Sequence, residues 1–361
     1  MLSAVFGYSP ATPEKAPVHP ERAAQIEEIN GKAATWKAAA HPRFAAEAPG
    51  ASATLCGAKG NWAAQLRDSI RMGEIEEYVP SPGLAAAPDS FDSATNWPKC
   101  AKTIGDIRDQ SNCGCCWAFG GAEAASDRMC IASKGELLLP LSAQDVCFNA
   151  GGMFSSGCNG GQISTPWDYI KHTGAVTGGQ YQNSGPFASD GPFCSQFSLP
   201  HCHHHGPQGK DPYPAEGQPG CPSESSPAGP KKCDSDAVSA HSDFKADKYS
   251  FSGTIQSASG PANIKSMIME GGPVETAFTV YSDFENYAGG VYKHTTGEPV
   301  GGHAVKIVGW GTDGGVDYWK VANSWNPYWG EEGYFRIAFG EGGIDDQVVG
   351  SSASATWAKK A

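Results

Sequence analysis

The chain of 361 residues lacks features that would place it in several other classes of protein. No apolar run approaches the roughly 18 residues that span a bilayer, so we expect no membrane segment. The apolar stretch at 2–8 is too short for a signal-peptide core, which indicates a removed signal or an incomplete N-terminus. Basic residues are scarce: 26 Lys and Arg stand against 38 Asp and Glu, and the net charge of −12 excludes nucleic acid as a partner.

Cysteine, by contrast, is abundant. Twelve cysteines exceed what a reducing cytosol usually tolerates outside metal or catalytic sites, so we expect a secreted or lumenal protein that contains disulfides. Because no Asn-x-Ser/Thr sequence occurs, glycosylation gives no information about the compartment.

One of these cysteines stands at the start of a predicted helix. Apolar residues recur at roughly helical spacing from Trp117 to Met129, which places Cys116 at the helix N-terminus. There, unpaired N–H groups and a partial positive charge favour a thiolate. Six residues earlier, Gln110 supplies an amide that can converge with the Cys116 N–H on a developing oxyanion. The pattern predicts an activated nucleophile.

A base and an orienting group follow later in the chain. His303 opens an alternating run that predicts a strand, and Asn323 ends a second such run. The Asn323 amide can hold an imidazole in one tautomer, and Trp325 can exclude water from the pair. Cys116, His303 and Asn323 thus fit the roles of nucleophile, base and orienter.

In this order, the motifs resemble those of the papain-like cysteine proteases, whose signature has Ser or Ala where this chain has Cys115. The resemblance implies an α+β fold of two lobes, one helical and one strand-rich and barrel-like, with the active-site cleft between them. It implies no cofactor and no metal. The catalytic residues that it implies are Cys116, His303, Asn323 and Gln110. Two alternatives stay open: a redox protein with a Cys113-x-x-Cys116 pair, and a catalytically inactive binding protein.

A long insert indicates one group within this family. The spacing between Cys116 and His303 exceeds the roughly 130–150 residues of papain-type enzymes, and the excess lies largely in the Pro- and Gly-rich segment 184–236. This segment resembles the occluding loop of cathepsin B, in which two adjacent histidines bind the C-terminal carboxylate of the substrate. By this resemblance the two are His204 and His205. A zinc site is the alternative for the Cys/His cluster, and a loop without function is another.

The resemblance also assigns substrate-binding positions. Gly160 and Gly161 belong to a segment that pairs with extended substrate, and glycines allow its backbone close approach. Gln347 stands where cathepsin B has a glutamate in the pocket for the second residue before the cleaved bond. Gln keeps the size but loses the charge, which predicts that arginine is disfavoured there unless Asp345 or Asp346 supplies the charge.

Three disulfides are expected by the same resemblance: Cys100–Cys130, Cys113–Cys158 and Cys202–Cys221. The residues themselves leave the pairing of four other cysteines open, namely Cys115, Cys147, Cys194 and Cys233.

The first 86 residues differ in character from the rest. They are rich in Ala and Glu, contain a helical segment near 25–30 and the sequence Leu55-Cys56-Gly57, and run into a Pro/Ala linker at 79–88. They resemble the propeptide of cathepsin B-like proteases, which blocks the cleft; an ordinary N-terminal subdomain is the alternative. The expected domains are a propeptide at 1–86, a catalytic domain at 87–351 with an insert at about 194–233, and a C-terminal tail at 352–361.

Taken as a whole, the sequence predicts the inactive precursor of a cathepsin B-like endopeptidase and carboxydipeptidase, located in the lysosome or vacuole or secreted. The expected partners are peptide and protein substrates, the chain's own propeptide as inhibitor, and cystatin-like inhibitors. We expect a monomer that binds neither nucleic acid nor membranes.

Overall fold

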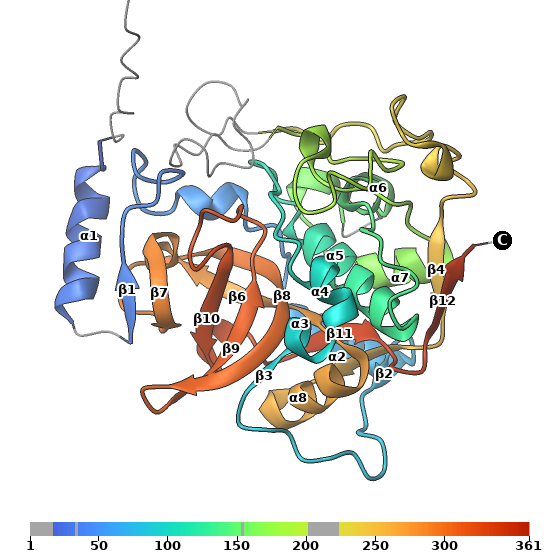
Figure 1. The fold of residues 1–361 in the computed structure, drawn as a ribbon. Coiled ribbons are helices and arrows are strands. Elements are labelled where there is room, and N and C mark those ends of the chain that lie inside the picture. Colours follow the sequence, from blue (N-terminus) through green and yellow to red (C-terminus); the bar gives the residue numbers. More distant parts are fainter. Residues whose placement is uncertain (1–16, 33–34, 153–154, 201–223, 361) are drawn as a thin grey trace, which may run out of the picture.

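The computed structural model describes residues 17–32, 35–152, 155–200 and 224–360. The expectations for His204, His205 and a Cys202–Cys221 bridge lie outside these residues. The helices of residues 116–172 gather on one side of the molecule and most strands on the other, where the helix at 20–31 also lies (Figure 1). This arrangement is the two-lobed α+β architecture that the resemblance implied.

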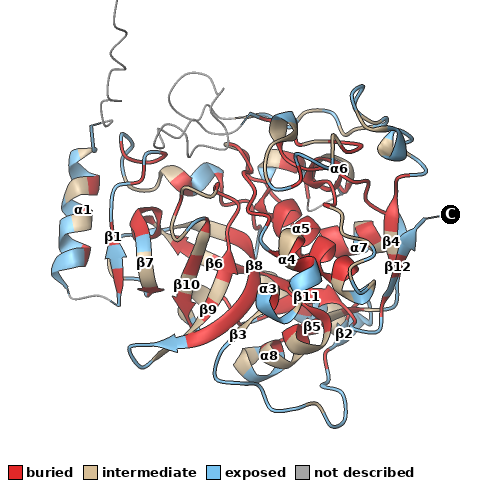
Figure 2. Cartoon of the chain, viewed as in Figure 1, coloured by how far each residue is buried: buried red, intermediate tan, exposed pale blue. Residues whose placement is uncertain are grey.

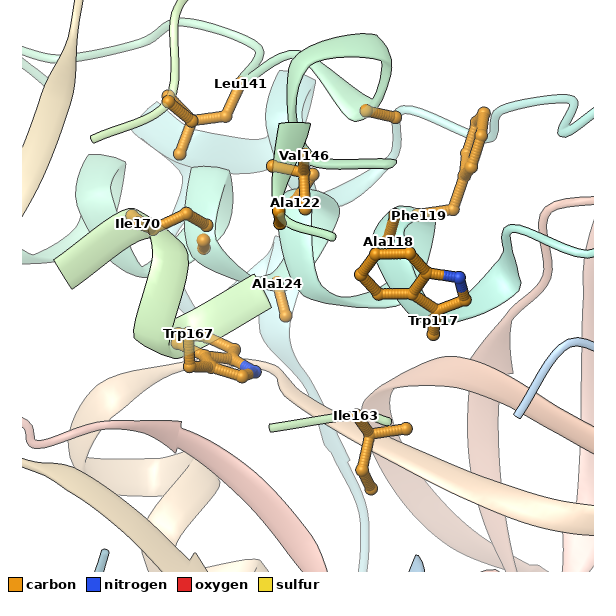
Figure 3. Packing of buried hydrophobic residues seen from close by; sticks show 14 of the residues in the cluster. Trp117, Ala118, Phe119, Ala122, Ala124, Leu141, Val146, Ile163, Trp167 and Ile170 are labelled. Carbon is orange, nitrogen blue, oxygen red and sulfur yellow. The ribbon is translucent and has the colours of Figure 1, made fainter. Parts of the chain in front are cut away.

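The helical lobe is built around α5, Cys116–Ala132. Every residue of α5 as far as Cys130 is buried (Figure 2), so the helix shows no exposed polar face and lies inside the lobe. It packs against two shorter helices, α6 (Ala143–Asn149) and α7 (Thr165–His172). Large apolar side chains such as Trp117, Phe119 and Trp167 belong to the buried cluster of this lobe (Figure 3).

The strand-rich lobe is one sheet of ten strands in the order β1-β7-β10-β9-β8-β6-β11-β5-β2, with β3 paired to β8. The long central strand, β8, joins β6 and β9 in antiparallel register. The described strands follow an open path, so the expected barrel-like lobe is not a closed barrel. The strands that belong to this sheet after residue 90 are β3 (Phe91–Asp92), β5 (Ile255–Ala258), β6 (Val274–Tyr281), β7 (Tyr287–Tyr292), β8 (Pro299–Asp313), β9 (Val316–Ala322), β10 (Tyr334–Ala338) and β11 (Val348–Ser351).

The N-terminal segment supplies the strand at each end of this sheet. β1 (Trp36–Ala38) pairs antiparallel with β7, and β2 (Glu76–Glu77) pairs parallel with β5. Two helices, α1 (Pro20–Gly31) and α2 (Trp62–Met72), accompany them. The segment therefore satisfies backbone groups at both sheet edges, which otherwise stand unpaired.

After β2 the chain is exposed until it rejoins the catalytic part. Tyr78 N donates to Ser257 O at 2.8 Å, and Trp310 Nε1 donates to Pro88 O at 2.9 Å. Between these two contacts the side chains lie mostly in solvent. The predicted linker is thus an exposed stretch, attached at its two ends and by one hydrogen bond in between, from Ser81 N to Glu270 Oε1 at 3.2 Å.

The remaining elements are α3 (Ser93–Asn96), α4 (Ala101–Ile104), α8 (Gly260–Gly271), β4 (Tyr249–Ser252) and β12 (Thr356–Lys359). β12 pairs antiparallel with β4, and Trp357 packs on Phe251 with ring centroids 4.9 Å apart. The expected C-terminal tail therefore contains a strand that is attached to the helical lobe. Within the described ranges, no helix has the length and apolarity needed to cross a membrane.

The described residues contain three disulfides: Cys100–Cys130, Cys113–Cys158 and Cys194–Cys233. The first two are pairs that the resemblance implied, and the third settles two of the four cysteines whose pairing the sequence left open. Cys115 and Cys147 are free and buried. Because Cys113 is bonded to Cys158, the alternative of a Cys113–Cys116 redox pair is wrong for this structure.

Candidate active site

Cys116 begins α5, as predicted from the apolar periodicity. Its Sγ accepts hydrogen bonds from two backbone N–H groups, Gly57 N at 3.2 Å and Ala304 N at 3.3 Å. Ala304 follows His303 in β8, so the thiol lies where the helical lobe meets the strand-rich lobe. Gly57 belongs to the N-terminal segment, which therefore reaches the nucleophile directly.

His303 is fixed by the residues predicted to orient it. Its Nε2 donates to Asn323 Oδ1 at 2.8 Å, and Ser324 N donates to the same oxygen at 2.8 Å. The ring lies 4.9 Å from the ring of Trp325, centroid to centroid. Since Nε2 is engaged with the amide, Nδ1 is the nitrogen left to exchange a proton with a thiol.

Gln110 holds a carbonyl of the N-terminal segment. Its Nε2 donates to Leu55 O at 3.0 Å and to Cys113 O at 2.7 Å. The amide is set by Ser324, whose Oγ donates to Gln110 Oε1 at 2.7 Å and whose carbonyl accepts from Gln110 N at 2.9 Å. Ser324 is a positioning residue that sequence analysis missed; its place next to Asn323 is the only signal that could have found it.

The N-terminal segment crosses the cleft through its backbone. Gly161 N donates to Gly57 O at 2.8 Å, and Lys59 N donates to Gly161 O at 3.0 Å. On the opposite wall, Ala58 N donates to Gly302 O at 3.0 Å. Gly160 and Gly161 leave room for this path, because a Cβ on Gly160 would lie 2.5 Å from Gly57 O. The predicted substrate-binding glycines thus contact an extended peptide of the same chain.

Burial in this assembly alters both reactive groups. Desolvation raises the pKa of the Cys116 thiol to about 12, although the N–H groups of Ala304 and Gly57 act in the opposite direction. Desolvation also lowers the pKa of His303 to about 4, and the hydrogen bond to Asn323 offsets only part of that shift. Both shifts favour the neutral forms and therefore oppose a thiolate–imidazolium pair in this state.

Aromatic and charged side chains of the N-terminal segment cover the site further. Phe44 packs edge-on against Trp325 at a centroid distance of 5.6 Å, and Arg43 Nη2 donates to Ser111 O at 2.8 Å. Arg43 Nη1 also lies 3.7 Å from Oδ1 of Asp109, the residue that precedes Gln110. These contacts shield the imidazole side of the cleft from water.

A buried ion pair anchors the same segment at a distance from the thiol. Arg22 Nη2 lies 2.8 Å from Glu285 Oε2, and both side chains are fully buried. Glu285 also accepts hydrogen bonds from Gly50 N at 3.1 Å and Ser52 N at 2.7 Å. Sequence analysis missed this anchor, because nothing in the local sequence marks Glu285 as buried.

Gln347, the residue predicted to lie in a substrate pocket, is buried, with 5% of its surface exposed, and its Oε1 accepts from Ser257 Oγ at 2.5 Å.

One cluster of sulfur ligands occurs in the described ranges, formed by Cys113, Cys115 and Cys147 with ligand atoms within 4.8 Å of one another. Since Cys113 is in a disulfide, two thiols remain there, too few for the usual four-ligand structural zinc site.

Comparison with known proteins agrees with this geometry. Residues 87–352 match the papain family of cysteine proteases. The chain belongs to that family.

Within the family, the chain is similar to cathepsin B-like proteases. Cathepsin B-like cysteine proteinase 6 of Caenorhabditis elegans is 46% identical over 270 residues, which cover 73% of this chain and 66% of that protein. The gut-specific cysteine proteinase of the same organism is 40% identical over 296 residues, which cover 81% of this chain and 80% of the relative. Among solved structures, procathepsin B S9 from Trypanosoma congolense superimposes with a TM-score of 0.69 at 27% identity, over 93% of this chain and 98% of that one.

Proposed function

We propose that the chain is the inactive precursor of a peptidase that cleaves peptide bonds through a Cys116 thiolate and His303. Asn323 orients the imidazole, and Gln110 donates to the developing oxyanion. One observation carries this proposal: a peptide backbone already occupies the site, with Leu55 O on the Gln110 amide and Gly57 N on the Cys116 sulfur.

This peptide is held in a way that prevents its cleavage. Attack needs one carbonyl group whose carbon faces the thiolate and whose oxygen lies in the oxyanion hole. Here the oxygen at Gln110 belongs to Leu55, whereas the group at Cys116 is the N–H of Gly57. Because two different peptide groups fill the two positions, neither is poised to react.

Removal of the N-terminal segment is the proposed route to activity. We place the propeptide at 1–86 and its cleavage in the exposed stretch between Tyr78 and Pro88, where Ser81 N donates to Glu270 Oε1 at 3.2 Å and the side chains lie mostly in solvent. Water then reaches Cys116 and His303, so the desolvation that favours their neutral forms is relieved and the ion pair can form. Gly160, Gly161, Trp325 and Gln347 then line the cleft for substrate.

Carboxydipeptidase activity is a further part of the proposal, and it rests on the resemblance of the insert to an occluding loop. The Cys194–Cys233 bridge joins the two ends of that insert, which supports a closed loop between them. His204 and His205 would hold the substrate carboxylate while they are protonated, and would lose it above roughly pH 6.5. We accordingly expect dipeptide release to fall with rising pH before internal cleavage does. The double variant His204→Ala, His205→Ala should lose dipeptide release and keep internal cleavage; unaltered dipeptide release would refute this role.

The experiment that tests the central proposal is alkylation of the processed protein. A peptidyl epoxide should modify Cys116 stoichiometrically, and a dipeptidyl fluorogenic amide should be hydrolysed. The variant Cys116→Ser should fold but hydrolyse nothing, since a hydroxyl ionises far less readily than a thiol. Hydrolysis that persists in this variant excludes Cys116 as the nucleophile, whereas a wild-type protein that binds peptides without hydrolysis would be the inactive binding protein.

For the compartment we propose a lysosome, a vacuole or the exterior of the cell, with cystatin-like inhibitors as partners.

A further inference from the structure

Two buried thiols adjoin the loop that leads to the nucleophile, and the proposed reaction uses neither of them. Cys115 is the N-cap residue of α5, Cys147 lies in α6, and both side chains are fully buried. Their sulfur atoms lie within 4.8 Å of each other and of the Cys113 sulfur. Burial and a hydrogen bond between the two thiols both raise the pKa of Cys115. The two thiols therefore face each other where α5 packs against α6.

The surroundings of this pair are oxidised. Three disulfides occur in the described ranges, and one of them, Cys113–Cys158, includes the sulfur next to the pair. A free thiol beside a disulfide can attack one of its sulfurs and exchange partners. A bond between Cys115 and Cys147 removes that route, whereas two free thiols leave it open. The free cysteines among the described residues are the pair itself, the nucleophile Cys116, and Cys56 of the N-terminal segment.

Side-chain rotation is enough to bring the two sulfurs into bonding distance. A disulfide needs sulfur atoms about 2.05 Å apart. Each Sγ can take three staggered positions about its Cα–Cβ bond, and these positions lie roughly 3 Å from one another. A change of rotamer at Cys115 or Cys147 can therefore close a gap of at most 4.8 Å.

We propose that Cys115 and Cys147 form a disulfide when the protein folds in an oxidising compartment, and that this bridge ties the residue before the nucleophile to α6. The oxidant is a small disulfide of the glutathione class. One cysteine thiolate attacks it and releases one small thiol, and the other thiolate attacks the mixed disulfide and releases the second. The two cysteine protons pass to the two released thiols. Because both sulfurs are buried once the helices have packed, the bridge forms before that packing is complete.

The bridge attaches the loop before Cys116 from a second side. Cys113 already fastens this loop to Cys158. The carbonyl of Cys113 accepts from Gln110 Nε2 at 2.7 Å, so the proposed oxyanion donor is held against the same loop. A bond from Cys115 to α6 adds a covalent attachment two residues further on. The inference is independent of the peptidase assignment, because it concerns side chains that do not react with substrate.

The first test maps the disulfides of the full-length precursor, produced in a secretory host. The protein is quenched in acid, denatured without reduction, alkylated with a maleimide, digested and analysed by mass spectrometry. Cys56 and Cys116 should be alkylated and serve as internal controls for free thiols. Cys115 and Cys147 should escape alkylation until the protein is reduced. In the variant Cys147→Ala, Cys115 should instead be alkylated to the same extent as Cys56.

The second test compares the Tm of the wild-type precursor with that of Cys115→Ser, Cys147→Ala and the double variant. In the unfolded chain, the shortest path between the two cysteines runs through the Cys113–Cys158 bridge, with two residues on one side and eleven on the other. Loss of a bridge that closes a loop of about 15 residues should lower Tm by roughly 5–10 °C. Because removal of either cysteine removes the whole bridge, the double variant should fall no further than the single variants. Two independent thiols would instead give losses that add.

Alkylation of Cys115 and Cys147 in the unreduced wild type to the same extent as Cys56 would overturn the proposal. A bridge from either residue to another cysteine would overturn it too, as would Tm losses that add in the double variant. The mapping of the wild-type protein decides the question even where a variant fails to fold.

Discussion

Substitution of Gly57 by alanine should release the block at Cys116. A Cβ at this position would lie 1.8 Å from Gly114 O and 2.4 Å from Gly114 C. Both atoms belong to the backbone loop just before Cys116, so neither can move aside as a flexible side chain would. The segment must therefore withdraw from the floor of the cleft.

The magnitude follows from the bonds that such a withdrawal breaks. Gly57 takes part in two of them, to Cys116 Sγ and from Gly161 N, and the adjacent Ala58 and Lys59 N–H groups make two more. At about 0.5–1.5 kcal/mol net for each, their loss amounts to roughly 2–6 kcal/mol. Even the lower figure corresponds to about a 30-fold larger open population of the precursor.

The assay is the rate at which a peptidyl epoxide alkylates Cys116 in the intact precursor, with gel analysis to confirm that no cleavage has occurred. Gly57→Ala should react at least tenfold faster than wild type. The matched control is Gly31→Ala at the end of α1, where an added Cβ meets nothing within 4 Å. Equal alkylation rates for Gly57→Ala, Gly31→Ala and wild type would refute the reasoning, provided that thermal unfolding shows all three to be folded.

Three further outcomes follow from the contacts of the site and its surroundings. Gln110→Ala should lower kcat of the processed enzyme about 10²–10³-fold with little change in KM, as expected for loss of one oxyanion donor; an unchanged kcat would remove Gln110 from that role. Arg22→Ala leaves Glu285 buried without its cation, which should destabilise the docked N-terminal segment by about 3–5 kcal/mol. The precursor should therefore be processed faster, whereas the kcat of the processed enzyme, which lacks residue 22, should not change. Equal processing rates for variant and wild type would contradict this. Burial raises the pKa of Glu123 to about 8 from an ordinary value of 4.5, so its favourable contribution to the free energy of unfolding is complete below pH 4.5 and is lost as pH rises through 8. Glu123→Gln should remove up to about 5 kcal/mol of this pH dependence, which is measured as the change of Tm between pH 4.5 and 8. Parallel Tm curves for variant and wild type would exclude this role of Glu123.

The sequence was most informative where a side chain or a periodic pattern determines the structure. The apolar residues after Cys116 predicted a helix, and α5 begins there, although it is buried on all sides as far as Cys130 and so has no polar face that would sharpen the period. The alternating runs predicted β8 and β9, and these strands bring His303 and Asn323 within 2.8 Å of each other. In each case the information lies in the identity of residues close together in the chain.

Other features depend on burial or on pairings between distant residues, and local sequence does not encode them. Ser324 sets the Gln110 amide, and Arg22 meets Glu285, only because the fold brings these pairs together. The Cys194–Cys233 bridge was left open for the same reason, since cysteine connectivity cannot be read from spacing. β1 and β2 were not predicted either, because strands of three and two residues are too short to show a period.

In the N-terminal segment, one contact depends on the identity of a local residue, whereas the others depend on pairings between distant parts of the chain. Its contacts with the cleft run through backbone groups, namely the carbonyls of Leu55 and Gly57 and the N–H groups of Gly57, Ala58 and Lys59. Almost any residue can make backbone contacts of this kind. The walls of the cleft that bind the N-terminal segment could therefore bind peptides of varied sequence once that segment is removed. What is specific is the glycine at position 57, since it alone lets the chain approach the loop before Cys116 with the wrong peptide group facing the thiol. In the proposed mechanism a substrate would use the same backbone partners as the N-terminal segment, but would present one carbonyl group to both Cys116 and Gln110.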